Sequence, residues 1–183
     1  MKTLKKFISE VTQPEKVSVV LGRFSPFHIS HSKIIEMMKY KPIVLLVKGT
    51  GSSEDKEKNP FDEKYQEYLI KKVFPNVKVI VVKNANLAPI RFHLEKSGEY
   101  QIAEIIAGPD RLPSYKSQLK DFADRIEFTE TPRATSTDSD RTASATAVRE
   151  AIRSENEAEF KKLMPRQLWG EWDTMVEKLK QES

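Results

Sequence analysis

Short runs of β-branched apolar residues alternate along this chain with longer segments whose apolar residues recur every three or four positions. The runs are almost uncharged and too short for helices, so they predict buried strands, and the segments between them predict helices. Buried strands joined by helices form parallel sheets. We therefore expect an α/β fold, a Rossmann-like doubly wound parallel sheet with helices on both faces. The expected strands are residues 17–21, 43–47, 77–82, 102–107 and 125–128, and the expected helices are 30–40, 61–74, 87–96 and 113–122.

The composition changes after residue 128. Residues 129–146 are small, polar and prone to turns, which predicts a loop. The pattern beyond this loop is helical, so we expect a C-terminal helical tail. We expect an amphipathic N-terminal extension (residues 1–14), one domain (15–164) and a C-terminal helix packed on that domain (165–183). The helices expected after the loop are 147–153, 155–163 and about 167–180.

Composition limits the function classes. The 183 residues suit one globular domain, and no apolar run approaches the roughly 20 residues of a membrane span, so we expect no membrane partner. There is no cysteine for a disulfide or a thiolate metal site, which fits a cytoplasmic protein, or one of a host cytoplasm if the chain is viral. The net charge is +4, and basic residues are interleaved with acidic ones along the chain. This pattern favours a small anionic ligand over nucleic acid.

The stretch "VSVVLGRFSPFHISH" (residues 17–31) carries the most unusual pattern. A strand ends at Gly22, where a ligand can approach the backbone closely, and a helix capped by Ser30 or Ser32 is expected to follow. His28 and His31 then fall about one turn apart beside the free N–H groups of a helix start, which attract anions.

Three interpretations of this histidine pair stay open at this point. The imidazoles are structural, or they hold phosphates and act as general acid and base, or they bind zinc. Zinc is the poorest of these, since only His93 remains as a third imidazole and no cysteine is present.

The stretch "RTASATAVREAIR" predicts a second anion-binding helix start. We interpret Thr146 as the N-cap, with Ser144 just before it. Arg149 then stands where a capping box has Glu or Gln, and Arg153 adds a like charge one turn later. Cations at a helix start oppose its dipole, so they make sense if a strongly negative ligand docks there. The alternative is a solvated helix start.

Two further junctions follow strands. Lys48 opens the loop "KGTGSSEDKEKNPF", which lacks the Walker A pattern and suits a surface loop. "AGPDR" places Asp110 and Arg111 after another strand, although a turn with a surface ion pair would look the same. In open α/β sheets, ligands bind beyond the carboxyl ends of the strands, so we expect all four junctions at one edge.

Together these motifs resemble the nucleotidyltransferase superfamily with the HIGH signature. "GRFSPFHISH" resembles its G-R-F-x-P-x-H-x-G-H motif, "SATAVREAI" its I-S-S-T-x-x-R motif, "AGPDR" its G-P-D turn, and "NPFDEKYQEYLIKKVFP" its N-P-F segment. The likeness is to members that resemble nicotinamide-mononucleotide adenylyltransferases or phage-type cytidylyltransferases, and it spans about residues 17–163. Ser30 replaces the motif's glycine, and Ala145 stands where a hydroxyl is common.

The resemblance implies transfer of a nucleotidyl group from ATP or CTP to a small phosphorylated acceptor, with Mg²⁺ accompanying the triphosphate and pyrophosphate as the second product. An adenylyl group and nicotinamide mononucleotide are the first candidates. Alternatives are cytidylyl transfer to a phosphorylated alcohol and a non-catalytic nucleotide-binding or assembly module, and a homo-oligomer stays open. No metal ligation by the protein itself is expected.

The resemblance also implies roles for particular residues. The catalytic residues would be His28, His31 and Arg149. The acceptor side is expected in the segment "NANLAPIRFHLEKSGEY", where Asn84 and His93 are further candidates beside Asn86 and Arg91, or where a surface loop and helix simply lie. The nucleotide-binding residues would be Gly22, Arg23, Phe24, Gly108, Asp110, Arg111, Ser144 and Thr146, and the acceptor-binding residues Lys48, Asn86 and Arg91.

Overall fold

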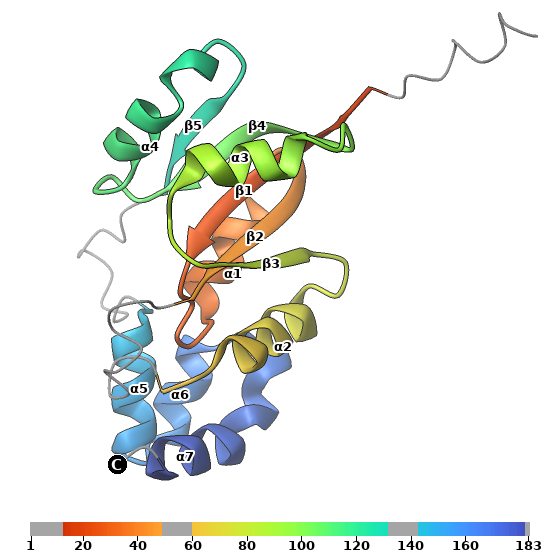
Figure 1. The fold of residues 1–183 in the computed structure, drawn as a ribbon. Coiled ribbons are helices and arrows are strands. Elements are labelled where there is room, and N and C mark those ends of the chain that lie inside the picture. Colours follow the sequence, from red (N-terminus) through yellow and green to blue (C-terminus); the bar gives the residue numbers. More distant parts are fainter. Residues whose placement is uncertain (1–12, 49–59, 132–142, 182–183) are drawn as a thin grey trace, which may run out of the picture.

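The computed structural model describes residues 13–48, 60–131 and 143–181, which contain a five-stranded sheet (Figure 1). The strands lie in the order β3-β2-β1-β4-β5, and every neighbouring pair is parallel. The chain winds outward from β1 to β3 and then crosses back to β4, so the topology switches between β1 and β4. The predicted Rossmann-like fold is confirmed. The strands are β1 (Glu15–Gly22), β2 (Lys41–Val47), β3 (Lys78–Val82), β4 (Tyr100–Ala107) and β5 (Glu127–Glu130).

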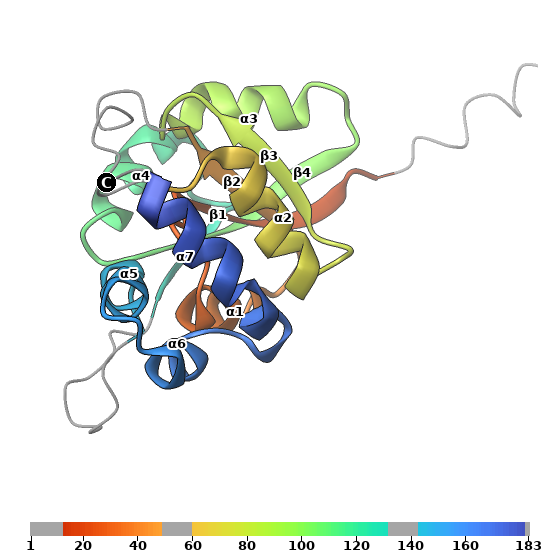
Figure 2. The ribbon, with the colours of Figure 1, turned by 90° about the horizontal axis from the view of Figure 1, so that it is seen from below.

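Helices cover both faces of the sheet (Figures 1 and 2). α3 and α4 pack on one face, and α1, α2, α5, α6 and α7 pack on the other. The helices are α1 (Ile29–Glu36), α2 (Glu63–Val73), α3 (Leu87–Glu95), α4 (Leu112–Gln118), α5 (Ala145–Arg153), α6 (Glu157–Leu163) and α7 (Trp172–Gln181), with short 3₁₀ helices η1 (Lys120–Phe122) and η2 (Arg166–Glu171).

The apolar runs of β1 and β2 divide between two cores because successive side chains of a strand point to opposite faces. Val19 and Leu45 pack under α3 and α4, whereas Val20, Val44 and Leu46 pack under the helices of the other face. All five are almost fully buried. Burial on both faces explains why these strands are continuously apolar rather than alternating.

The helix predicted for residues 30–40 is shorter than expected, because α1 ends at Glu36. The backbone N–H of Lys39 donates to Glu104 Oε2 at 3.0 Å, and that of Tyr40 donates to Ser18 Oγ at 3.0 Å. The Ser18 hydroxyl in turn donates to Glu104 Oε2. A fully buried carboxylate on β4 and the hydroxyl bonded to it thus accept the backbone N–H groups that would have continued the helix.

Other boundaries differ by a few residues. β5 begins two residues later than predicted and runs to Glu130. α6 begins at Glu157 because the Asn156 side chain accepts the Glu159 N–H at 3.0 Å and caps the helix there. The segment predicted as one helix over 113–122 is α4 followed by η1, and that predicted over 167–180 is η2 followed by α7.

The C-terminal tail is anchored to α2 by one buried carboxylate. Glu171 accepts hydrogen bonds from the hydroxyls of Tyr65 at 2.9 Å and Tyr68 at 2.8 Å, and from Lys72 Nζ at 2.5 Å. These donors hold the pKa of the Glu171 carboxyl below its usual value, against the opposing effect of burial. The tail also contributes apolar side chains to the core: Leu168, Met175 and Leu179.

Three predicted segments lie wholly or largely outside the described residues: most of the N-terminal extension, most of the loop after Lys48 and most of the loop after β5. Within the described ranges, no helix is both long and apolar enough to span a bilayer.

Candidate active site

The turn between β1 and α1 is built around Phe24. This residue has a positive φ of 52°, and its ring folds back over Gly22. A Cβ atom at Gly22 would lie 2.9 Å from Phe24 Cζ, so a glycine is required for this close approach. The ring is buried in the core and meets the His31 ring edge-on at 4.7 Å, whereas Arg23 is exposed.

The two histidines of the turn are in contact with each other. His28, rather than Ser30 or Ser32, is the N-cap residue of α1, which corrects the predicted cap. Its backbone N–H donates to His31 Nδ1 at 3.3 Å, and the two ring centroids lie 3.8 Å apart. Since Nδ1 of His31 accepts this bond, the proton of a neutral His31 belongs on Nε2.

Both imidazoles are neutral near pH 7. Burial lowers the pKa of His28 from 6.5 to about 4. The pKa of His31 also lies well below its usual value, first because of burial and second because His28 stands beside it. A bound phosphate would favour the charged form of each ring, so an anion at this turn should raise both pKa values.

Four buried polar atoms surround this turn without a hydrogen-bond partner among the described residues. They are Ser25 Oγ, His28 Nδ1, Ser32 Oγ and Gln66 Nε2. A buried polar atom without a partner costs about 1–3 kcal/mol, so native proteins contain few of them. Their concentration at one turn is the signal expected of a binding site.

The start of α5 differs from the prediction. Ser144, not Thr146, is the N-cap, and its hydroxyl accepts the Ala147 N–H at 3.1 Å. Thr146 therefore lies within the first turn of the helix, and Arg149 lies in the second turn rather than the first. Ala147, and not Arg149, therefore occupies the capping-box position, so the prediction that Arg149 opposes the helix dipole from that position is wrong.

The structure nevertheless brings the second motif against the first. Arg149 Nη1 donates to the Ser25 carbonyl at 2.6 Å, across 124 residues of sequence, and its Nη2 donates to Thr146 Oγ1 at 3.2 Å. The Ser30 hydroxyl donates to the Ala143 carbonyl at 2.9 Å. Both contacts join the β1–α1 segment to the entry of α5, so the hydroxyls and guanidinium of one motif adjoin the imidazoles of the other.

The turn at residues 108–111 follows β4, the strand that pairs with β1. A Cβ atom at Gly108 would lie 2.8 Å from Asp110 Oδ1, so the carboxylate folds closely over the glycine. Asp110 and Arg111 are largely exposed and 3.6 Å apart. Lys48, after β2, is also exposed and lies 3.6 Å from Glu63 at the start of α2. Gly108, Asp110 and Arg111 follow the carboxyl end of β4, and Lys48 follows that of β2.

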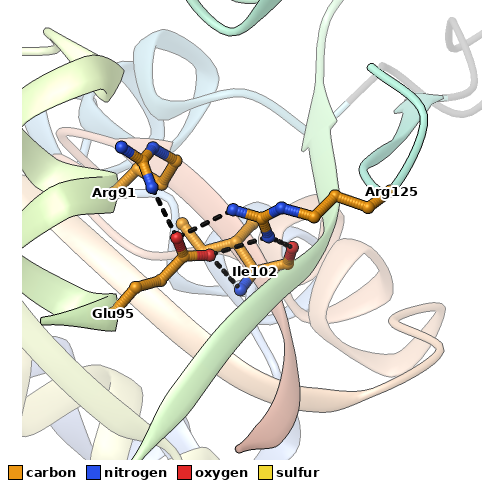
Figure 3. Close-up of polar contacts among 4 residues, drawn as sticks. All are labelled: Arg91, Glu95, Ile102 and Arg125. Atoms are coloured by element: carbon orange, nitrogen blue, oxygen red, sulfur yellow. Dashed lines mark hydrogen bonds and ion pairs between the residues drawn. The ribbon is translucent and has the colours of Figure 1, made fainter. Parts of the chain in front are cut away.

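Arg91 lies in a different environment, shown in Figure 3. Its guanidinium donates to Glu95 at 2.6 Å and stacks 3.8 Å from the Phe122 ring centre. Glu95 also accepts two bonds from Arg125 and one from the Ile102 N–H. Ile102 pairs with Val17, toward the amino ends of β4 and β1, so this cluster is far along the strands from their carboxyl edge.

Asn86 caps α3 without a side-chain hydrogen bond to the helix. A hollow of about 780 Å³ runs between α3 and the edge strand β3, and its lining includes Asn84 and His93. Asn84 follows the carboxyl end of β3, and His28 follows the carboxyl end of β1. One end of this hollow therefore reaches the same edge of the sheet as the histidine turn. Asn84 and Asn86 thus lie nearer the carboxyl end of β3 than Arg91 does.

Sequence reasoning missed Gln66, which is buried beside the turn and accepts the Phe27 N–H at 3.2 Å. The available signal was a polar residue at helical spacing from Leu69 and Ile70, on the face of α2 expected to be buried. It missed Glu104 as well, a charged residue inside an otherwise apolar strand.

Comparison with solved structures shows the same fold in other proteins. The structure is similar to that of a Vibrio parahaemolyticus protein provisionally assigned as a nicotinate-nucleotide adenylyltransferase, with a TM-score of 0.60, 16% identity, and coverage of 92% of this chain and 97% of that one. It is also similar to Thermotoga maritima TmcAL bound with alpha-thio ATP, with a TM-score of 0.57, 13% identity, and coverage of 90% of this chain and 56% of that one. No protein-family model and no curated protein sequence matches the chain.

Proposed function

We propose that this protein is a nucleotidyltransferase that moves an adenylyl group from ATP to a small phosphorylated acceptor. The observation that carries the proposal is the Arg149–Ser25 contact, since it joins the two motifs expected to hold a triphosphate. The similarity of the fold to the provisionally assigned adenylyltransferase and to ATP-analogue-bound TmcAL supports it. Nicotinamide mononucleotide is the first candidate acceptor.

The reaction is an in-line displacement. An oxygen of the acceptor's phosphate attacks the α-phosphorus, a new P–O bond forms, and the bond to the bridging oxygen of the β-phosphate breaks. Pyrophosphate leaves with the electron pair of that bond. Catalysis of this kind consists mainly of positioning the reactants and stabilising charge.

The residues divide these tasks. His28 and His31 contact the α- and β-phosphates, and their neutral state in the free protein lets them take up protons as the anion binds. Arg149, with the hydroxyls of Ser144 and Thr146, holds the departing β- and γ-phosphates. Gly22, Arg23, Phe24, Gly108, Asp110 and Arg111 line the nucleotide, with the Phe24 ring supporting the turn from inside the core.

Magnesium would arrive bound to the triphosphate. It prefers oxygen ligands, whereas this turn offers imidazole and guanidinium nitrogens together with hydroxyls. The described part of the chain brings together no group of three or more His, Asp or Glu side chains suited to a metal ion. The imidazole, guanidinium and hydroxyl donors would therefore hold the phosphates of a metal–triphosphate complex, and the metal would supply charge neutralisation.

The acceptor would lie on the β2–β3 side of the turn. Lys48 and Asn86 follow the ends of β2 and β3, and the hollow between α3 and β3 begins at Asn84. Arg91 would contribute indirectly, since Glu95 and Phe122 engage its guanidinium.

The test is acceptor-dependent release of pyrophosphate by the purified protein with Mg²⁺, with ATP or CTP offered against a panel of phosphorylated acceptors. His31→Ala should lower turnover on the order of 10²–10³-fold with the fold intact, the usual effect of losing one preorganised donor. Turnover with CTP alone would replace adenylyl by cytidylyl transfer. Binding of ATP without turnover on any acceptor would favour a nucleotide-binding module.

A further inference from the structure

Gln66 is an amide placed where the fold alone would favour an apolar residue. It lies on α2 with 1% of its surface exposed, one turn before the fully buried Leu69 and Ile70. Burying a side-chain amide is unfavourable unless its polar atoms are hydrogen-bonded. Oε1 of Gln66 accepts the backbone N–H of Phe27 at 3.2 Å, and Nε2 has no partner among the described residues.

The bond reaches the peptide group directly before the histidine pair. Phe27 immediately precedes His28, the N-cap of α1. The Phe27 side chain is fully buried, and its ring stacks on that of His31 with centroids 5.6 Å apart and an angle of 29° between the planes. Gln66 therefore fixes the backbone of the one residue that adjoins His28 in sequence and supports His31 by ring contact.

We propose that Gln66 is a positioning residue for nucleotidyl transfer, which holds the Phe27 peptide so that both imidazoles face the phosphates. The proposal rests on the proposed function. The half of the amide that is bonded orients the turn. The other half, Nε2, is a neutral donor at the same turn as Ser25 Oγ and His28 Nδ1, which also have no partner among the described residues. A neutral amide adds donors there without the negative charge that would repel a triphosphate.

The expected effect is on turnover rather than on binding of the triphosphate. A displacement of reacting groups by about 1 Å costs up to about 10²-fold in rate. Gln66→Met keeps the length and burial of the side chain and removes both hydrogen-bonding groups. It should lower kcat at least about 10-fold and leave the KM for ATP within about 2-fold, because Arg149 and Ser144 still hold the distal phosphates.

The matched control is Tyr65→Phe. It changes the adjacent residue of the same helix and removes the hydrogen bond to Glu171, without touching the β1–α1 turn. It should lower the melting temperature and leave kcat unchanged. Equal kcat for Gln66→Met and the wild type would overturn the proposal.

A second measurement does not depend on activity. Hydrogen exchange of the Phe27 amide, followed by NMR in the free protein, should accelerate at least about 10-fold in Gln66→Met and stay unchanged in Tyr65→Phe. Gln66→Glu keeps an acceptor oxygen for Phe27 and should keep this protection, while its added carboxylate weakens ATP binding. Loss of protection in Gln66→Glu, or unchanged protection in Gln66→Met, would refute the proposed contact. A wild-type protein without turnover would instead refute the proposed function, and the exchange experiment would still decide what Gln66 holds.

Discussion

Protonation of His28 should make the stability of this protein fall steeply in mild acid. Burial lowers the pKa of His28 to about 4 in the folded state, against 6.5 for an exposed histidine. Between these values the unfolded chain binds a proton that the folded protein does not, so the free energy of unfolding decreases as the pH decreases. The stabilising contribution is complete above pH 6.5 and is lost through the interval down to about pH 4.

The magnitude follows from that interval. One pH unit of difference corresponds to about 1.4 kcal/mol, so the whole interval amounts to about 3 kcal/mol and the part reached at pH 4.5 to about 2.5 kcal/mol. His31 acts in the same direction, since its pKa is also lowered. A loss of this size is a large fraction of the total stability of an ordinary domain.

The assay compares the wild type with His28→Asn. Asparagine is a favoured N-cap residue, so the substitution keeps an acceptor at the start of α1 and removes the titrating group. Urea unfolding of both proteins at pH 8 and pH 4.5 cancels the contributions of ionisable groups that do not interact with His28, whereas His31 loses one cause of its lowered pKa in the variant. The wild type should lose about 2–3 kcal/mol more than His28→Asn. Equal losses would show that His28 is not held neutral by burial, and the account of the imidazole pair would fail with it.

Three further substitutions test other contacts. Arg149→Met removes the bond to Ser25 and should weaken ATP binding, measured by calorimetry, at least about 10-fold. It should also lower the free energy of unfolding of the free protein, measured in urea, by about 1–2 kcal/mol. Unchanged affinity would place Arg149 outside the site. Ser30→Ala should cost about 1 kcal/mol through the lost bond to Ala143, and Ser30→Thr should restore it; equal stability of the two variants would argue against that bond. Glu171→Gln should lower the melting temperature at pH 7. This deficit should shrink as the pH falls through the lowered pKa of the Glu171 carboxyl, because the carboxyl stabilises the folded state only while it is ionised. A deficit that does not change with pH would mean that its charge contributes nothing.

The fold could be predicted because its signal is local. The central strand runs, such as that of β2, are apolar on both faces, and the helical segments show three- and four-residue spacing of their apolar residues. What local patterns do not contain is the end of α1, because the groups that terminate it come from Ser18 and from Glu104, 65 residues further along the chain. Choosing Thr146 as the N-cap of α5 failed for a related reason, since Ser144 is as good a cap on composition alone.

Some residues of the candidate site could likewise be predicted from the sequence, and others could not. His28, His31 and Arg149 could be selected from motif spacing, and the structure brings the segments that carry them together. The burial of Gln66 could have been inferred from its spacing to Leu69, but its partner could not, because that partner is a backbone N–H group 39 residues away and backbone groups carry no residue-type signal. Arg91 showed the reverse problem, because a cation on a helix can equally bind a ligand or pair with a carboxylate such as Glu95.

The placement of the tail has a consequence for the order in which the two cores can form during synthesis. The core under α3 and α4 is assembled entirely from residues 17–128, so all of its side chains are synthesised before the C-terminal tail. The opposite core requires Phe160, Leu168, Met175 and Leu179, and until these are made the face of β1 and β2 that carries the histidine turn has an incomplete cover. A nascent chain stalled after β5 would therefore have that face covered only by α1 and α2, and such exposed apolar surface binds chaperones or aggregates.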